Sequence, residues 1–335
     1  MIRTQLGILI VSVVAALSAT SVAFGQAPKP INRLATMSSQ PGAAERADID
    51  AYVRYYAERL VSEDLAECED ARDRLSSPLR SPGLTLIFRS AYSGPLIDAL
   101  GSVILQDDRP MAAFNAIQII SLLATQNALE EMRQHCKISD EPRPEIRLRA
   151  AIGIQNILIH AGTNVIPPRD ETRAIRDLGD AAEAETVDWV LYRQFHALAS
   201  VENAVATQVL DAAFDSVVAR LRGGQASELV VALRPAIVNM RDRQLADPSS
   251  GTATAPRLTN LLELPLEHWA GAVASDSLRA SYLEFIKNAE AVLQIIDQPR
   301  GRRLQSELSK SFLAGDRDGY DRSLGHVREV ISSYR

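Results

Sequence analysis

Two segments of this chain carry the same pattern of small and apolar residues 37 positions apart, and this repetition limits the possible folds more than any other feature. In each copy, small side chains allow neighbouring helices to approach, while isoleucines fill the space between layers. Apolar positions at helical spacing, repeated at such a period, are typical of stacked helical hairpins. When Gln118 is aligned with Gln155, Ala113, Ala116, Ile117 and Ile120 coincide with Ala150, Gly153, Ile154 and Ile157.

The rest of the chain is consistent with helices. Only 5% of the residues are aromatic, and no β-hairpin signal is present, so thin helical layers are favoured over a β-sandwich. The segment 146–159 is apolar nearly all round, as expected for a helix flanked on several sides. Proline-containing turns predict breaks between helices at 94–95, 107–110, 139–144 and 162–168.

Residues 144–157 resemble the second helix of a HEAT repeat, with a proline, an apolar residue, Arg147, an Ala-Ala pair and a spaced apolar seam. The resemblance implies an all-α, HEAT-like (armadillo-type) α-hairpin solenoid, a fold that usually binds partners. In that family the arginine commonly pairs with an acidic residue of the preceding turn, here Asp140 or Glu141. The earlier copy has Pro110 where Arg147 would stand, so an irregular multi-helical bundle is the alternative.

The first 27 residues have the pattern of a cleavable secretory signal. A positive charge at Arg3 precedes an apolar run from Leu6 to Leu17, and small residues follow. An uncleaved anchor is the alternative, because serine and threonine extend the apolar run to about 20 residues, the length that spans a bilayer. We expect a secreted or periplasmic protein with no integral membrane segment after cleavage.

The charge of the chain argues against nucleic-acid binding. The formal net charge is −6, and removal of residues 1–27 takes away Arg3 alone among charged side chains, which makes the mature chain slightly more acidic. Lys/Arg-rich surfaces supply most of the affinity for nucleic acid, and the chain has no such excess.

Four regions follow from composition. Residues 28–47, rich in proline, serine, glycine and alanine, are predicted to form a flexible linker. Residues 48–246 are predicted to be the HEAT-like helical domain and 257–335 a C-terminal helical region, and the stretch between them has linker composition. Near the start of the first helix, Tyr52 and Tyr56 share an apolar face and are predicted to be core residues.

Cys68 and Cys136 are the only cysteines. An exported chain meets an oxidising environment, so we expect them to form a disulfide, worth roughly 4 kcal/mol in the chain-entropy model. Two buried free thiols are the alternative. No Cys-x-x-Cys or other signature surrounds either residue, which argues against a catalytic cysteine.

Known catalytic and cofactor motifs are absent from the sequence. The five histidines include no pair at i, i+4 spacing, so no zinc site is predicted. There is no P-loop, no dinucleotide-binding glycine motif and no Gly-x-Ser-x-Gly turn. The acidic loop 315–321 lacks the spacing of an EF-hand. We therefore expect no cofactor, and a non-enzymatic function is favoured.

Polar residues at matched repeat positions are the candidate binding site. If the repeats stack, Gln118 and Gln155 lie one above the other, with Arg149 and Asn156 on nearby edges. Such a row can bind a peptide backbone, or it can serve as a structural amide ladder between repeats. The sequence favours an exported, non-catalytic protein-binding scaffold. The alternatives are a helical enzyme or glycan-binding protein with a site between distant helices, and a structural envelope component.

Overall fold

The structure is a computed structural model that describes residues 27–106, 108–162, 165–224, 227–298, 304 and 306–332. Across these residues the chain is all-α, with helices and turns and no strand. The predicted all-α class is therefore confirmed. The predicted signal segment 1–27 lies, except for Ala27, outside the described residues, as does the end of the chain after residue 332.

The helices succeed one another with short connections. In chain order they are η1 (Asn32–Leu34), α1 (Ala43–Leu60), α2 (Leu65–Ser76), η2 (Ser77–Arg80), α3 (Leu86–Ile104), α4 (Pro110–Ile120), α5 (Gln126–Gln134), α6 (Pro144–His160), α7 (Pro168–Ala184), α8 (Asp188–Ser200), α9 (Ala204–Arg222), η3 (Ser227–Leu233), α10 (Arg234–Ala246), η4 (Pro248–Ser250), α11 (Gly251–Glu267), α12 (Trp269–Ala274), α13 (Asp276–Asp297), α14 (Leu308–Ala314) and α15 (Arg317–Ser332).

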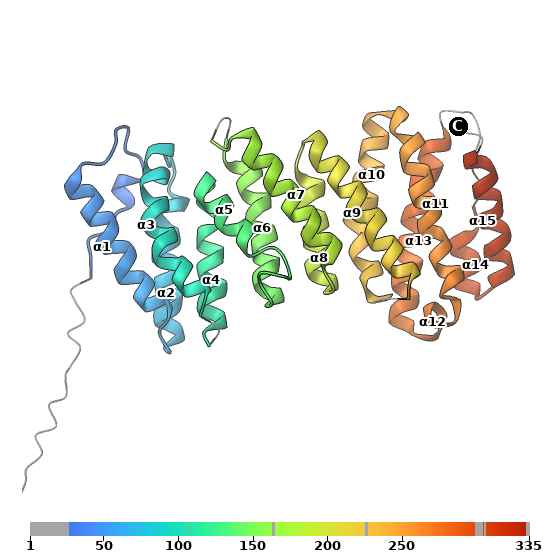
Figure 1. Cartoon of the computed structure of the whole chain (residues 1–335), viewed down its shortest axis with the longest axis horizontal. Coiled ribbons are helices and arrows are strands. Elements are labelled where there is room, and N and C mark those ends of the chain that lie inside the picture. Colours follow the sequence, from blue (N-terminus) through green and yellow to red (C-terminus); the bar gives the residue numbers. More distant parts are fainter. Residues whose placement is uncertain are drawn as a thin grey trace, which may run out of the picture.

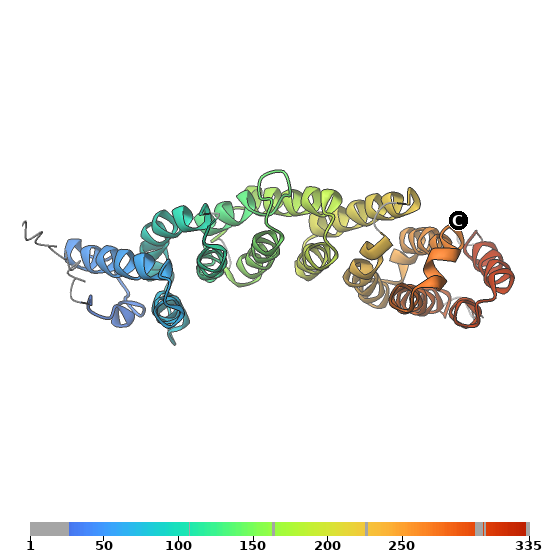
Figure 2. The same ribbon diagram turned by 90° about the horizontal axis from the view of Figure 1, so that it is seen from below.

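The helices form two layers in an elongated row (Figure 1). In the first layer α1, α3, α5, α7 and α9 each contact the next, and in the second layer α2, α4, α6, α8 and α10 do the same. Each odd-numbered helix from α1 to α7 pairs with the even-numbered helix that follows it. Figure 2 shows that the row arches gently, with both ends displaced towards the second layer. The exposed side of the second layer is therefore the inner side of the arch.

The C-terminal end continues both layers. Helix α11 packs against α9 and α13 packs against α10, while α14 and α15 cover this end by contacting α13 and α11 respectively. Between α11 and α13, the short helix α12 turns the chain (Figure 1). No helix of the described residues is both long and apolar enough to cross a membrane.

Local sequence signals set most helix starts. Proline occupies the first position of α4, α6 and α7, where its missing N–H costs nothing. Several other helices begin with a side chain that accepts a hydrogen bond from a backbone N–H of the first turn. These capping residues are Asp64, Thr85, Thr125, Asn203 and Ser275.

The predicted break at residues 94–95 is wrong, because α3 runs from Leu86 to Ile104 without interruption. Pro95 removes one backbone donor, but Leu96 and Leu100 beyond it are fully buried. Packing of the second half of α3 against its neighbours therefore outweighs the local preference for a break.

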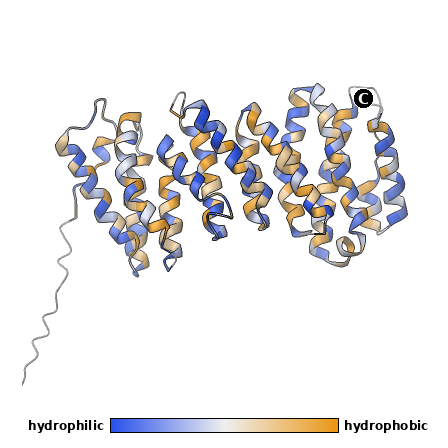
Figure 3. Ribbon diagram, viewed as in Figure 1, coloured by the Kyte–Doolittle hydropathy of each residue, from blue (hydrophilic) through white to orange (hydrophobic). Residues whose placement is uncertain are grey.

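The core lies between the two layers. Figure 3 shows hydrophobic and hydrophilic residues mixed along each helix, as expected for helices that bury only part of their surface. Tyr52 and Tyr56 are buried in this core, as the helical spacing predicted. The hydroxyl of Tyr52 donates to the carbonyl of Arg74 at 2.8 Å, so its polar group is satisfied.

Part of the segment 28–47, predicted to be a linker, is packed against the helices. Ile31, Leu34 and Ala35 are buried, and the backbone N–H of Thr85 donates to the carbonyl of Ala35 at 2.9 Å. Helix α1 begins at Ala43, five residues before the expected start. Three apolar residues within a polar composition are enough to hold this segment against α3.

The stretch between residues 246 and 257 is a packed turn and not an exposed linker. It forms η4 and the first turns of α11, in which Thr254 and Ala255 are buried. The side chain of Gln244 donates to the carbonyl of Pro248 at 3.1 Å and accepts from the hydroxyl of Ser250 at 3.1 Å. One continuous core includes residues on both sides of this turn.

Candidate binding surface on the second layer

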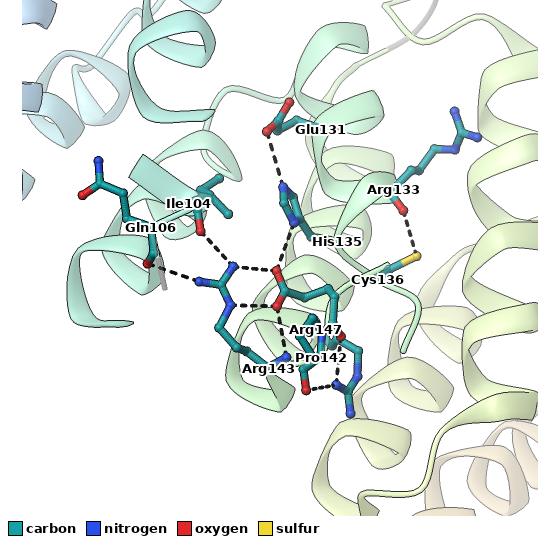
Figure 4. A network of polar contacts seen from close by, with 10 residues as sticks. Ile104, Gln106, Glu131, Arg133, His135, Cys136, Pro142, Arg143 and Arg147 are labelled. Atoms are coloured by element: carbon teal, nitrogen blue, oxygen red, sulfur yellow. Dashed lines mark hydrogen bonds and ion pairs between the residues drawn. The ribbon is translucent and has the colours of Figure 1, made fainter. Parts of the chain in front are cut away.

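A buried network of polar residues surrounds Glu141, in the turn between α5 and α6 (Figure 4). Arg143 donates two hydrogen bonds of 2.7 Å to the Glu141 carboxylate and one of 2.8 Å to the carbonyl of Ile104 at the end of α3. On the other side, His135 Nδ1 lies 3.2 Å from Glu141 and its Nε2 lies 3.5 Å from Glu131. This network connects α3, α5 and the start of α6.

The opposite charges in this network stabilise the ionised forms of His135 and Glu141. Burial alone would lower the pKa of His135, but hydrogen bonds with Glu131 and Glu141 and their negative charges raise it to about 9. Burial alone would raise the pKa of Glu141, but hydrogen bonds from Arg143 and His135 lower it to about 2. Both groups are therefore charged at neutral pH, and neither is poised to exchange a proton there.

Arg147 links α6 to the next hairpin. It pairs with Glu185, which precedes α8, and it also donates to the backbone carbonyls of Glu141 at 3.0 Å and Pro142 at 2.8 Å. The expected ion pair of Arg147 with Asp140 or Glu141 is therefore wrong, because the preceding turn offers it only backbone carbonyls. Since these groups all have partners, the network serves to hold hairpins together.

The predicted disulfide is not formed, and Cys68 and Cys136 are both buried free thiols. Cys68 donates to the carbonyl of Leu60 at 3.2 Å and lies 3.4 Å from the side-chain nitrogen of Asn115 in α4. Cys136 follows α5 and donates to the carbonyl of Arg133 at 3.3 Å. The two thiols are held in different hairpins. Burial and the charge of Asp177 raise the pKa of Cys136 to about 12, so it is unreactive.

The four predicted binding residues lie on neighbouring helices of the second layer. Gln118 is on α4, while Arg149, Gln155 and Asn156 are on α6, and all four are half-buried. Among the described residues, the side-chain amides of Gln118, Gln155 and Asn156 form no hydrogen bond. The expected hydrogen-bonded ladder between Gln118 and Gln155 is thus absent from this part of the chain, and these amides are open to an external partner.

Arg149 is the centre of a cationic and aromatic cluster. Its guanidinium carbon lies 4.2 Å from the centre of the Phe114 ring on α4, in a cation–π arrangement. Its Nε is buried without a hydrogen-bond partner, and within the described residues Arg149 forms no ion pair with a carboxylate. Burial and the positive charge of Arg193 on α8 lower the pKa of Arg149. A cation in this position lacks the anion that usually accompanies it.

Helix α8 extends the cluster with Tyr192 and Arg193, which the sequence did not single out, and with His196. Tyr192 and His196 stack with ring centres 6.4 Å apart, and His196 Nδ1 is buried without a partner. Burial and the charge of Arg193 lower the pKa of His196. We call the group formed by these three helices the second-layer face, which comprises Phe114, Gln118, Arg149, Gln155, Asn156, Tyr192, Arg193 and His196.

Exposed apolar residues gather on the same layer. Of the large hydrophobic side chains that the described residues leave exposed, six come from its helices or from the adjoining η3. They belong to different helices, so exposed apolar side chains occur at several places along the second layer. These six are Leu65, Met111, Ile159, Trp189, Val231 and Leu245.

The described residues contain no group of three or more His, Cys, Asp or Glu side chains arranged to hold a metal ion. No protein-family model matches this chain, and no curated protein matches it significantly. The molecule is an all-α, two-layered protein with a cationic, aromatic and partly apolar group of residues on its second layer.

Proposed function

We propose that this chain is an exported HEAT-like repeat protein that acts as a non-catalytic scaffold and binds a protein partner on its second-layer face. Successive helical hairpins stacked in two layers support the repeat interpretation, because each hairpin buries its apolar surface only against its neighbours. The inner side of such an arch is an extended surface suited to a macromolecule.

One observation carries the proposal: the guanidinium of Arg149 is half-buried over Phe114 with no carboxylate partner among the described residues. Leaving a cation partly desolvated costs free energy, and an acidic group of a partner would offset that cost. Arg193 adds a second cation to which the structure gives no ion pair within the described residues. The chemistry therefore suits a protein segment that combines carboxylates with apolar side chains.

The open amides of Gln118, Gln155 and Asn156 complement this surface. A side-chain amide has both donors and an acceptor, so it can pair with the backbone of an extended segment. Exposed Met111 and Trp189 provide apolar contacts at the same layer, and aromatic residues, methionine and arginine are the residue types enriched at protein interfaces.

The test is a quantitative pull-down from envelope extract with tagged residues 28–335, read by mass spectrometry at low and high salt. A double variant, Arg149→Glu with Arg193→Glu, reverses both charges of the second-layer face. Arg173→Glu with Arg176→Glu makes the same change on the exposed side of α7 in the first layer and is the matched control.

A stoichiometric partner retained by the wild type and the control, and lost by the double variant, is the expected result. Retention at high salt would assign most of the affinity to apolar contacts, since salt screens exposed charges. Equal recovery with both double variants would exclude the second-layer face as the binding surface. Recovery of no partner above a tag-only background would contradict the scaffold function.

Export is tested separately. Expression of the full chain followed by intact-mass measurement of the exported protein is expected to give a mature N-terminus near residue 28. A full-length mass for the exported protein would show that the segment is an uncleaved anchor.

A further inference from the structure

A cavity of about 380 Å³ lies at the C-terminal end of the row, remote from the second-layer face of α4, α6 and α8. It is formed by the corner between α11 and α12, with contributions from the ends of α9, α13 and α15. Its volume falls within the range of small-molecule sites, about 300–1,000 Å³. Its apolar side comes from Leu221, Leu266, Trp269, Ala272, Leu278 and Tyr282, and polar groups form the rest of the lining.

The aromatic side of the cavity is held in place by packing. The Trp269 ring meets Phe312 edge-on at 5.5 Å and Tyr320 at 5.7 Å, and Tyr282 stacks on Phe312 at 6.2 Å. Tyr320 is anchored in turn, since its hydroxyl donates to the carbonyl of Leu262 at 2.9 Å. Because these rings support one another, the wall exists before any ligand arrives, which reduces the entropic cost of binding.

Tyr282 brings a polar group without a partner to this wall. Its side chain is buried, with 1% of the residue exposed, and it lines the cavity. Unlike the hydroxyls of Tyr52, Tyr92 and Tyr320, its hydroxyl forms no hydrogen bond within the described residues. Burial and the charges of Glu228 and Glu267 raise the pKa of Tyr282, so this group remains a donor at neutral pH.

Arg317 gives the cavity an uncompensated positive charge. It is exposed at the first position of α15, and its contact with the described residues is a 3.5 Å hydrogen bond to the carbonyl of Leu266. Glu267 also lines the cavity, and it pairs with Arg222 at 3.4 Å. His268 is held by a 2.8 Å hydrogen bond with the carbonyl of Leu221. Arg317 is therefore the one arginine of the lining, and it forms no ion pair within the described residues.

We propose that this cavity binds a small amphiphilic carboxylate, whose apolar part lies against Trp269 and Leu278 and whose carboxylate pairs with Arg317. Tyr282 supplies the second hydrogen-bond donor. An apolar body would pack against the apolar side chains of the lining, and a single negative charge would pair with Arg317. This site is independent of the scaffold function proposed for the second-layer face.

The proposal is tested by comparing the affinities of three probes that share an eight-carbon chain and differ in headgroup: octanoate, 1-octanol and octylammonium. Trp189→Phe leaves Trp269 as the one tryptophan of the chain, so its fluorescence reports directly on the cavity. We expect saturable fluorescence change with octanoate, and binding at least ten times weaker for the two probes that lack a carboxylate.

Two variants in this background locate the site. Arg317→Gln is expected to weaken octanoate binding about tenfold and to leave octanol unchanged, whereas Arg322→Gln, an exposed arginine on the same helix, is expected to leave both unchanged. Leu278→Phe narrows the cavity and is expected to weaken every probe that binds.

The proposal is overturned by any of three results. These are no saturable response to octanoate, equal binding of octanoate and octanol, or octanoate binding that both Arg317→Gln and Leu278→Phe leave intact. Because Arg317 is exposed, its substitution does not threaten the fold, so a loss of selectivity cannot be mistaken for unfolding.

Discussion

Arg147 donates two parallel hydrogen bonds of 2.8 Å to the carboxylate of Glu185, and both side chains are almost completely buried, at 1% and 0% exposure. The pair joins α6 to the turn before α8. The backbone N–H groups of Thr186 and Val187 also donate to Glu185, at 2.9 and 3.0 Å. The attraction within a buried ion pair offsets the cost of desolvation only when the remaining hydrogen-bonding positions of both groups are also filled. The backbone groups around Arg147 and Glu185 fill them.

Removal of one partner of this pair is expected to destabilise the protein strongly. Arg147→Met leaves the Glu185 carboxylate buried without its cation, and we expect a loss of about 3–5 kcal/mol in the free energy of unfolding. The double variant Arg147→Met with Glu185→Gln removes both charges, so it should lose less than the single variant. Urea unfolding followed by far-UV circular dichroism measures the free energy of unfolding of the single and the double variant. A double variant less stable than Arg147→Met would show that the cost does not come from the isolated charge.

The His135 cluster predicts a loss of stability at alkaline pH. The pKa of His135 is about 9 in the folded chain, above its ordinary value of 6.5. Its contribution is therefore fully present below pH 6.5 and is lost as the pH rises through about 9. We expect the stability difference between wild type and His135→Gln to shrink by about 3 kcal/mol between pH 6 and pH 10. Urea midpoints across this range provide the measurement.

His160, which is exposed at the end of α6, offers the matched His→Gln control for this pH series. A stability difference for His135→Gln that stays constant with pH would mean that the ion pairs with Glu131 and Glu141 add nothing to stability.

Close approach of α7 to α9 makes Gly179 sensitive to substitution. A Cβ atom at this position would lie 2.2 Å from Cγ1 of Val209, a β-branched side chain with little rotamer freedom. We expect Gly179→Ala to cost about 1–3 kcal/mol of unfolding free energy. Gly325 on α15 has open space at the same place, so Gly325→Ala should stabilise the helix by about 0.5–1 kcal/mol. Chemical denaturation of both variants measures the change in unfolding free energy. A change of the same sign in both variants would refute the packing argument.

The cysteines are expected to remain reduced. Cys68 and Cys136 are buried and apart in the fold, so the native protein should react slowly with a disulfide reagent. In denaturant without reductant, two thiols per chain should titrate. A count below two would reveal a cross-link and contradict the structure on this point.

Local chemistry determined the helical class and many helix boundaries. Pro110, Pro144 and Pro168 start α4, α6 and α7 as the sequence predicted, because a proline's fixed φ and missing N–H act through neighbouring residues only. The burial of Tyr52 and Tyr56 was likewise evident from their spacing along one helix. Gln118 and Gln155, which the 37-residue repeat aligns, lie on neighbouring helices of one layer.

Contacts between distant residues decided the rest. Pro95 lies within α3, and residues 31–35 are packed, because the free energy of burial there exceeds the local preference for a break or a flexible arm. Arg147 forms its ion pair with Glu185 and not with the acidic residues next to it in sequence. Arg149 lies over Phe114 and feels the charge of Arg193, and both of these residues come from adjacent helices. Spacing along the chain determines on which side of its helix a residue lies. Which side chain of a neighbouring helix it contacts is decided only by the stacking of the hairpins, because that contact depends on how the helices pack against one another.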